Sequence, residues 1–392
     1  MDSTHQHDDA PLYIDTAEDL AALCEQLAPA TWLALDTEFM RERTYQPELC
    51  LLQVGTPELA ACVDPLAIED LSPLLELIYD PQRVKVLHAA RQDLEIFYLL
   101  RGELPAPVFD TQLAATVLGH GDQVGYGALV QDVLGIGLDK SHARADWSRR
   151  PLDAAQIRYA ADDVRYLAQI YPRLLAELAE QRRLDWLSED FAALSRPQTY
   201  DNPPEEAWRR VSGANRLHGV QLAILQRLAS WREERARAIN KPRKWILKDD
   251  VLTDLARHAP TDLKHLERVR GLDGATVNRS GRELLGIIRE ARETPKDQWP
   301  EPTPRLRLDP GQEAVVDAMM AVLRQCADQN RVSAPALAAR RDLEAIVAGR
   351  RDVPLLQGWR AALAGETIES LLAGRLTLRV QDGRLVTEPS GT

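Results

Sequence analysis

The first half of the chain alternates between two patterns of apolar residues. Some apolar runs are short, continuous and bounded by turn residues, as in strands buried within a sheet. Other stretches place apolar residues three and four positions apart, which predicts helices with one buried face. The predicted strands are residues 12–14, 32–40, 50–54, 60–63, 84–87 and 108–109, and the predicted helices are residues 16–27, 71–79, 88–97, 111–118, 126–134 and 154–179. This alternation predicts an α/β domain with a mixed sheet.

The pattern changes after a proline-containing linker. Strand-like runs largely disappear, and residues 208–288 follow helical spacing. A second proline-rich segment separates this region from a further helical region. The predicted organisation is a disordered tail (1–10), the α/β domain (11–195), a linker (196–207), a first helical domain (208–293), a second linker (294–306) and a second helical domain (307–390).

The two helical regions are weakly related in sequence. At a shift of 91 positions, residues 221–228 align with 312–319 and residues 252–256 align with 343–347, with apolar residues in register. Two separate stretches in one register indicate a duplication. The second copy is shorter and lacks the basic cluster of the first.

The composition is that of an ordinary globular protein. A chain of 392 residues suggests two or three domains, and its 45% hydrophobic and 28% charged residues are typical of soluble folds. No apolar run approaches a membrane span, and the first residues show no secretion-signal pattern. The four cysteines are far apart and form no Cys-x-x-Cys pair, so neither a disulfide framework nor a zinc site is expected. These features predict a cytoplasmic protein.

The charge is unevenly distributed along the chain. The net charge is −12, but residues 205–293 hold 19 Lys and Arg against 13 Asp and Glu, an excess of +6 that leaves −18 for the rest. A uniformly basic nucleic-acid binder is therefore excluded, whereas a local basic surface is not. Residues 241–248 place four cations around Trp245, a composition suited to phosphate contacts. The alternative is a solvated loop that Trp245 holds to the core.

Two carboxylates interrupt the apolar run at residues 32–40. Asp36 and Glu38 are two positions apart, so they point to the same face of the predicted strand. Two buried carboxylates side by side repel each other and lose hydration, and a hard divalent cation relieves both effects. An isolated Asp-x-Glu more often marks the exit of a strand into a solvated loop. The metal interpretation therefore depends on further acids.

Further acids occur in suitable positions. Asp93 lies near the start of a helix that follows a strand, where α/β sheets place functional groups, although such an acid also complements the helix dipole. Tyr159 and Asp163 are four positions apart and share a helix face, which is also the pattern of a surface helix with Tyr159 packed on the core. Asp162 lies near that face too, and spacing does not separate it from Asp163.

Together these residues resemble the DEDD superfamily of 3′–5′ exonucleases, in the branch that carries Tyr rather than His. The motifs Leu35-Asp-Thr-Glu-Phe39 and Val86-Leu-His-Ala89, with the segment 146–152, resemble the ribonuclease D family more narrowly. Residues 240–247 resemble the helicase-and-RNase-D C-terminal (HRDC) domain, and a divergent second copy is also similar to that family. The resemblance implies an α/β ribonuclease-H-like exonuclease domain with a mixed sheet, followed by two small all-α domains.

The resemblance also implies a chemistry. Asp36, Glu38, Asp93 and Asp163 would hold two divalent metal ions, Mg²⁺ or Mn²⁺, for hydrolysis at phosphorus. Tyr159, with a reference pKa of about 10, is a poor base near neutrality and would orient the attacking water. The expected activity is 3′–5′ exoribonuclease trimming of tRNA precursors and other structured RNAs, with release of 5′-mononucleotides.

Two alternatives to this activity stay open. One is a DNA 3′–5′ exonuclease, because the metal site does not distinguish RNA from DNA. The other is a catalytically silent nucleic-acid-binding adaptor, against which the intact acids and tyrosine argue.

The resemblance and the charge pattern suggest residues that contact RNA. Lys140 and Arg150 are expected to bind phosphate, and Trp147 to lie near a base or to support the site, with core packing as the alternative. The expected nucleic-acid contacts are Lys140, Trp147, Arg150, Lys241, Arg243, Lys244 and Lys248. RNA, tRNA precursors and their 3′ ends above all, is the expected partner of a monomer that needs no organic cofactor and no membrane.

Overall fold

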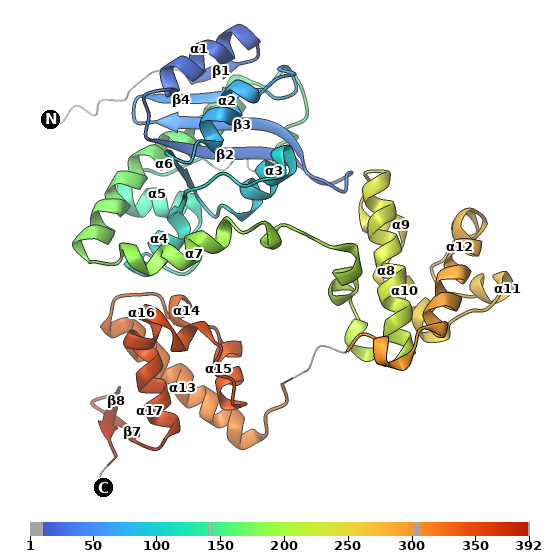
Figure 1. The fold of residues 1–392 in the computed structure, drawn as a ribbon. Helices are drawn as coiled ribbons and strands as arrows, with labels where there is room; N and C mark the ends of the chain where they lie inside the picture. The colour runs from blue at the N-terminus through green and yellow to red at the C-terminus, as the bar shows by residue number, and fades with distance from the viewer. Residues whose placement is uncertain (1–10, 140, 143, 302–305, 391–392) are drawn as a thin grey trace. The chain divides into compact units, whose positions relative to one another are not determined.

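The chain folds into two compact units, each described by itself. The computed structural model describes residues 11–139, 141–142, 144–301 and 306–390 (Figure 1). The first unit comprises residues 11–38, 49–199 and 306–390, and the second comprises residues 39–48 and 200–301. The predicted tail at residues 1–10 lies outside the described residues.

A mixed sheet of six strands forms the centre of the first unit. Its order is β1-β4-β3-β2-β5-β6, in which β1–β4, β2–β5 and β5–β6 are parallel pairs and β3–β4 is antiparallel. The strands are β1 (Leu12–Ile14), β2 (Trp32–Met40), β3 (Glu48–Thr56), β4 (Leu59–Val63), β5 (Val84–Leu87) and β6 (Val108–Asp110). The predicted mixed sheet is confirmed, and β2 lies inside it between β3 and β5.

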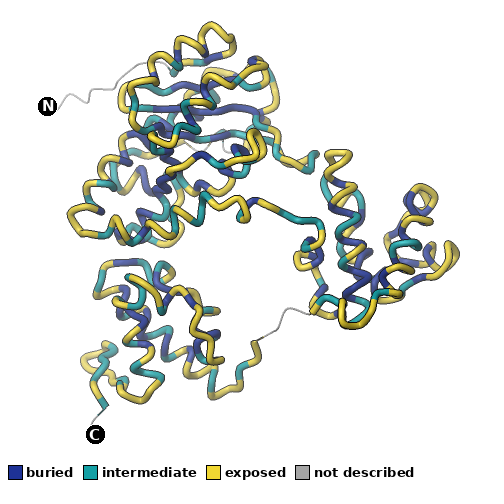
Figure 2. Tube along the Cα trace, viewed as in Figure 1, coloured by how far each residue is buried: buried dark blue, intermediate teal, exposed yellow. Residues whose placement is uncertain are grey.

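Helices cover both faces of this sheet. They are α1 (Ala17–Leu27), α2 (Ser72–Tyr79), α3 (Arg91–Arg101), α4 (Thr111–Leu118), α5 (Tyr126–Leu134), α6 (Ala154–Glu180) and α7 (Ser188–Leu194). Ala34 of β2 packs in one core with α4, α5 and α6, whereas its neighbours Leu33 and Leu35 point to the opposite face and are also fully buried. Figure 2 shows the buried residues concentrated along the strands and on the inner faces of the helices.

Helix α6 is the long helix that packs across the sheet. It begins at a capping box in which Asp153 accepts from the backbone N–H of Gln156, whose side chain accepts from the backbone N–H of Asp153. Its apolar face packs on the strands, and the ring of Tyr171 lies 4.9 Å from that of Trp32. This packing fixes α6 against β2.

Helix α3 begins later than the sequence predicts. The expected start was His88, but the helix begins at Arg91. The carboxylate of Asp110 accepts from the backbone N–H groups of Ala89 and Ala90, and Ala89 has a left-handed φ of 55°. A partner on another strand therefore holds residues 88–90 outside the helix.

The rest of the first unit is the second helical region. It contains α13 (Pro310–Gln329), α14 (Ala334–Leu337), α15 (Arg340–Val347), α16 (Gly358–Arg360), α17 (Glu366–Leu372), β7 (Leu376–Gln381) and β8 (Arg384–Pro389). The expected fold class is confirmed with one correction, because this region ends in an antiparallel hairpin and is not all-α. Leu376, Leu378 and Val380 alternate with polar residues, which is a strand pattern.

The second helical region packs against the end of the α/β fold. The rings of Trp186 and Trp359 stack with centroids 4.7 Å apart and planes 5° apart. Arg360 binds the carboxylate of Asp190 at 2.9 Å, and Arg183 donates to the carbonyl oxygen of Asn330 at 2.7 Å. These contacts explain why residues 306–390 belong to the first unit.

The second unit is helical. Its helices are α8 (Val220–Ala238), α9 (Arg243–Ile246), α10 (Asp249–His258), α11 (Leu263–Leu266) and α12 (Gly274–Glu293). Helices α8, α10, α11 and α12 share one apolar core. Helices α9 and α14 begin 91 positions apart, and so do α10 and α15. The equal shift in structure supports the duplication inferred from sequence. Nowhere in the described chain is a helix both long enough and apolar enough to cross a membrane.

The connection between β2 and β3 belongs to this second unit. The Tyr45 hydroxyl donates to the buried carboxylate of Glu233 at 2.6 Å. The Asn240 side chain accepts from the backbone N–H groups of Tyr45 and Gln46 at 3.0 and 3.2 Å. Residues 41–47 thus leave the sheet to pack with the helical unit, which no local sequence signal indicates.

Candidate active site

Strand β2 supplies two acids to one face of the sheet. Asp36 and Glu38 alternate with Thr37 along the strand, so both carboxylates point toward α6 and the threonine points away. Ala34, on the same face, packs in the core that α6 shares. The alternation of side chains along β2 therefore places both acids between β2 and α6.

Asp93 approaches from the first turn of α3. It is only 7% exposed, and its Oδ1 accepts a hydrogen bond from the Thr37 hydroxyl at 2.6 Å. Thr37 lies between Asp36 and Glu38 in the sequence. The hydroxyl thus links α3 to the strand that carries the two other acids.

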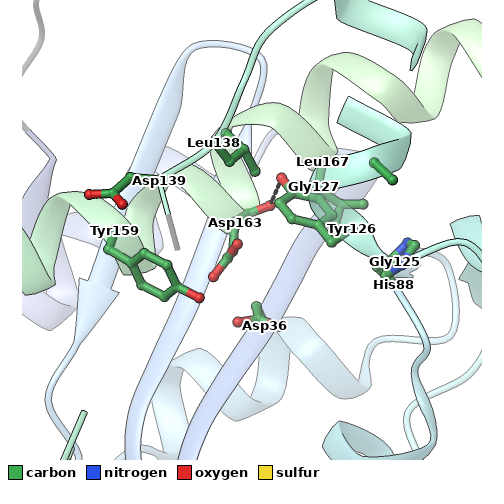
Figure 3. A pocket seen from close by; sticks show the side chains of 11 residues that line it. Asp36, His88, Gly125, Tyr126, Gly127, Leu138, Asp139, Tyr159, Asp163 and Leu167 are labelled. Carbon is green, nitrogen blue, oxygen red and sulfur yellow. Dashed lines mark hydrogen bonds between the residues drawn. The ribbon is translucent and has the colours of Figure 1, made fainter. Parts of the chain in front are cut away.

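Helix α6 supplies Tyr159 and Asp163. Figure 3 shows the side chains of Asp36, Tyr159 and Asp163 pointing toward one another. The Tyr126 hydroxyl donates to the backbone carbonyl oxygens of Asp162, at 3.0 Å, and of Asp163. The Asp162 carboxylate forms an ion pair with Arg165 at 2.7 Å, so it is engaged on the helix surface while Asp163 faces the other acids.

Three of the expected acids meet at one point. Single carboxylate oxygens of Asp36, Glu38 and Asp163 lie within 4.8 Å of one another. Asp93 does not join this trio in the described residues and remains hydrogen-bonded to Thr37. An all-oxygen, anionic donor set fits hard cations such as Mg²⁺ or Mn²⁺.

The electrostatics of the acids also fit a cation. Burial, followed by repulsion from Asp163 and Asp93, raises the pKa of Glu38 to about 8. Burial is also the largest cause that raises the pKa values of Asp93 and Asp163 to about 7. The pKa of Asp36 rises well above its usual range through burial and the charges of Asp163, Asp93 and Glu38. The raised pKa values mean that the four acids lose their protons with difficulty in this environment. A divalent cation would stabilise their ionised forms.

Tyr159 lies between two hollows beside the acids. One, of about 430 Å³, is lined by Asp36, Asp163, His88 and Tyr126 among others, and the second, of about 200 Å³, reaches toward His142. Burial and then the charges of the three clustered acids raise the pKa of Tyr159 above its usual value. The hydroxyl therefore stays protonated near neutrality and acts through hydrogen bonds.

Comparison with known proteins identifies the family. The 3′–5′ exonuclease family matches residues 11–179, and the HRDC domain matches residues 221–288. Ribonuclease D of Acidiphilium cryptum is 44% identical to this chain over 381 residues, which cover 96% of each chain. Ribonuclease D of Sphingobium indicum is also 44% identical, over 380 residues that cover 96% of this chain and 97% of the relative. The crystal structure of Escherichia coli RNase D, an exoribonuclease involved in structured RNA processing, matches with a TM-score of 0.82 and 35% identity over 93% of this chain and 99% of that chain. The chain belongs to the ribonuclease D family.

Ribonuclease D membership confirms the resemblance read from the motifs. The protein is a 3′–5′ exoribonuclease, a hydrolase of RNA, whose acidic cluster is of the kind that binds metal. The catalytic core of RRP6 from Trypanosoma brucei is a more distant structural match, with 25% identity and a TM-score of 0.57 over 73% of this chain and 80% of that core.

The guanidinium of Arg150 in this ribonuclease D is engaged within the protein and is not free to bind a phosphate. Its guanidinium donates to both carboxylate oxygens of Asp64 and to the carbonyl oxygens of Cys50, Trp147 and Arg149. All five N–H groups are therefore used within the protein. The expectation that Arg150 binds RNA is corrected, because this side chain links the loop before α6 to β3, through Cys50, and to Asp64, which directly follows β4.

Trp147 and Lys140 precede α6 as well. Trp147 is only 2% exposed, and its ring lies 6.2 Å from that of Tyr159. Burial favours the supporting role that the sequence left open over stacking on a base. Lys140 lies outside the described residues.

The basic segment of the second unit is open to solvent. Trp245 is 61% exposed, so it does not hold the segment to the core. Lys244 and Lys248 line a hollow of about 720 Å³ together with other polar residues. Arg243 differs, because its guanidinium lies 3.5 Å from the buried carboxylate of Glu233.

Sequence reasoning missed two residues that position the site. Thr37 lies inside the motif at positions 35–39, but only the fold shows that its hydroxyl binds Asp93. Tyr126 starts a predicted helix, and nothing in its surroundings indicates that its hydroxyl would reach the backbone of α6.

Proposed function

We propose that this ribonuclease D shortens structured RNAs, tRNA precursors among them, from the 3′ end and releases 5′-mononucleotides. The observation that carries the proposal is the convergence of Asp36, Glu38 and Asp163 within 4.8 Å beside Tyr159. The E. coli relative, which is involved in structured RNA processing, supports the choice of substrate.

The four acids would hold two divalent cations at the junction of β2, α3 and α6. Such cations, when bound, neutralise charge on the scissile phosphate and assist both the attacking and the leaving oxygen. Asp36, Glu38 and Asp163 would form the shared centre. Asp93, which accepts a hydrogen bond from the Thr37 hydroxyl in this structure, would bind one of the cations from α3. A catalytically silent adaptor would not need four acids close together, where their charges repel one another.

Tyr159 would orient the attacking water. Its hydroxyl is protonated near neutrality, so it donates or accepts a hydrogen bond and does not remove a proton. Trp147 and His142, with ring centroids 6.2 and 5.9 Å from the Tyr159 ring, restrict its movement. The side chain is thus held beside the acids before substrate arrives.

The decisive experiment follows single-nucleotide release from RNA and DNA labelled at either end. The full-length protein is expected to release 5′-mononucleotides from the 3′ end of a tRNA with a 3′ extension. EDTA should stop the reaction, and Mg²⁺ or Mn²⁺ should restore it. Equal rates on DNA and RNA would favour the DNA exonuclease, and no release under any metal condition would favour the adaptor.

Adjacent acids provide a matched control for the site. Asp163→Asn is expected to abolish hydrolysis, whereas Asp162→Asn should retain it because Asp162 pairs with Arg165 outside the cluster. Titration with Mn²⁺ should give two ions per wild-type chain. A stoichiometry of one would contradict the two-ion proposal while leaving the exonuclease site intact.

A further inference from the structure

A buried glutamine on the strand beside β2 has no partner. The Gln53 side chain is 0% exposed, and neither its amide nitrogen nor its amide oxygen has a hydrogen-bond partner. Burying an amide without hydrogen bonds destabilises a fold, and such groups are rare in native proteins. An apolar side chain would fill this position more favourably if packing were its only role.

Gln53 faces α6, as the acids do. Two residues further along β3, a Cβ on Gly55 would lie 3.0 Å from Cβ of Val164 in α6, so this face of β3 is turned toward the helix. Gln53 pairs across the antiparallel strands with Cys62, whose thiol donates to the backbone carbonyl of Ile157 in α6 at 3.6 Å. Gln53 therefore lies in the layer between the sheet and α6.

The acidic cluster lies in the same layer. Strand β3 is the direct neighbour of β2, about 4.8 Å away as in any sheet. The charges of Asp163 and Asp36 contribute to the raised pKa of the Cys62 thiol. The cross-strand pair of Gln53 and Cys62 is therefore close enough to these carboxylates to be affected by their charge. Between its contacts with Cys62 and Gly55, helix α6 buries Ala160 and Ala161, whose methyl groups offer the amide no partner. The Cys62 thiol is already bonded to Ile157, and on the neighbouring strand β2 the polar side chains on this face are the carboxylates of Asp36 and Glu38.

We propose that Gln53 is a positioning residue of the metal centre, whose amide N–H donates to the Asp36 carboxylate when divalent cations occupy the site. The inference rests on the proposed function, because it assigns Gln53 to the same centre. A hydrogen bond of this kind fixes the orientation of a carboxylate that binds metal. In this structure both polar atoms of the Gln53 amide are unpaired, so its N–H groups can donate to a carboxylate.

The test compares Gln53→Met with Leu52→Met in the full-length protein. Methionine is close to glutamine in size but offers no N–H, and Leu52 is an equally buried neighbour on the opposite face of β3. Mn²⁺ affinity is measured by calorimetry, and thermal unfolding is measured in EDTA and in Mn²⁺. Gln53→Met should weaken Mn²⁺ binding about 10-fold to 100-fold. It should not lower the melting temperature in EDTA, because it removes an unpaired buried amide.

Three outcomes separate the possibilities. Unchanged Mn²⁺ affinity in Gln53→Met would overturn the inference. A loss of affinity that parallels a lower melting temperature in EDTA would do the same, because it indicates a structural role. Asp36→Asn serves as the reference. If both Asp36→Asn and Gln53→Met bind Mn²⁺ normally, the proposed function fails. If Asp36→Asn loses Mn²⁺ binding but Gln53→Met does not, only the inference about Gln53 fails. Should Gln53→Met not fold, Gln53→Leu replaces it.

Discussion

At the scale of single residues, the acids make the cation-free protein sensitive to pH. Folding raises the pKa of Glu38 from 4.5 to about 8 and those of Asp93 and Asp163 from 3.8 to about 7. The folded state therefore binds these protons more tightly than the unfolded state does. The resulting stability is fully present below the unfolded pKa values and is lost as the pH rises through the folded ones.

We accordingly predict that the protein in EDTA melts at a lower temperature at about pH 8 than at about pH 5. Saturating Mg²⁺ should reduce this difference, because a bound cation stabilises the ionised acids. Asp36→Asn in EDTA should also show a smaller difference, since it removes one of the mutually repelling charges. Thermal unfolding monitored by circular dichroism provides the measurement. Identical melting temperatures at both pH values in EDTA would contradict the assigned electrostatics.

Tyr159 yields a second prediction at this scale. Tyr159→Phe is expected to lower kcat by about 100-fold, a typical loss when a group that positions a proton is removed. Mn²⁺ affinity should be retained, because a protonated hydroxyl is a weaker ligand for a hard cation than the carboxylates of the three clustered acids. Rates and calorimetric titrations of the same preparation separate the two effects. A variant with the full wild-type rate would make Tyr159 purely structural.

At the scale of elements, the site depends on how closely α6 approaches the sheet. A Cβ at Gly55 would lie 3.0 Å from both Cβ and the carbonyl oxygen of Val164, the residue next to Asp163. A side chain at position 55 would require Val164 to shift by a few tenths of an ångström. Because Gly55 has no side chain, α6 can pack close to β3, and this packing determines the distance between Asp163 and β2.

Gly55→Ala is therefore expected to push α6 away from β3. We predict a loss of about 1–3 kcal/mol in unfolding free energy, as for overpacked cores, together with reduced hydrolysis. Gly286→Ala in α12 is the control, because a Cβ there meets nothing within 4 Å, and it should not destabilise the protein. Denaturant unfolding and nucleotide release measure the two effects. Normal activity in a destabilised Gly55→Ala protein would show that the spacing of α6 is not critical for the site.

The elements also show how far sequence reasoning reaches. Helices α4 and α5 have the predicted bounds because their ends are local signals, the left-handed glycines 119 and 135. The acids of β2 and α6 were likewise found from local spacing. The start of α3 and the role of Arg150 were missed because each depends on a distant partner, Asp110 in one case and Asp64, 86 residues away, in the other.

At the scale of the whole molecule, chemistry and the basic excess lie in different units. The clustered acids and Tyr159 belong to the first unit, and the basic segment 241–248 belongs to the second. Truncation after residue 196 is a poor test of this division. It would also remove residues 306–390, which pack in the first unit against Trp186.

Point substitutions in the full chain are cleaner. Changing Lys241, Lys244 and Lys248 together to Ala should weaken binding to a tRNA with a 3′ extension, because three exposed cations near Trp245 are lost. The dependence of log K on log salt should become shallower by about one unit for each phosphate contact removed. Arg243 stays unchanged, since its loss would weaken the pairing of buried Glu233.

A charge-matched control tests whether position or net charge matters. Changing Arg341, Arg375 and Arg384 to Ala removes the same charge from the second helical region. This variant should keep the wild-type salt slope. If both triple variants lose affinity equally, the basic segment has no particular role in RNA binding.

The stacked pair Trp186 and Trp359 has a consequence for synthesis on the ribosome. The two rings are 173 residues apart in sequence. At about 5–20 residues per second, translation of that interval takes about 10–35 s, far longer than the collapse of a newly made chain. During this time the face of the Trp186 ring that stacks on Trp359 is uncovered in the newly made exonuclease fold. Chaperones that recognise exposed apolar surface have that interval in which to bind this face.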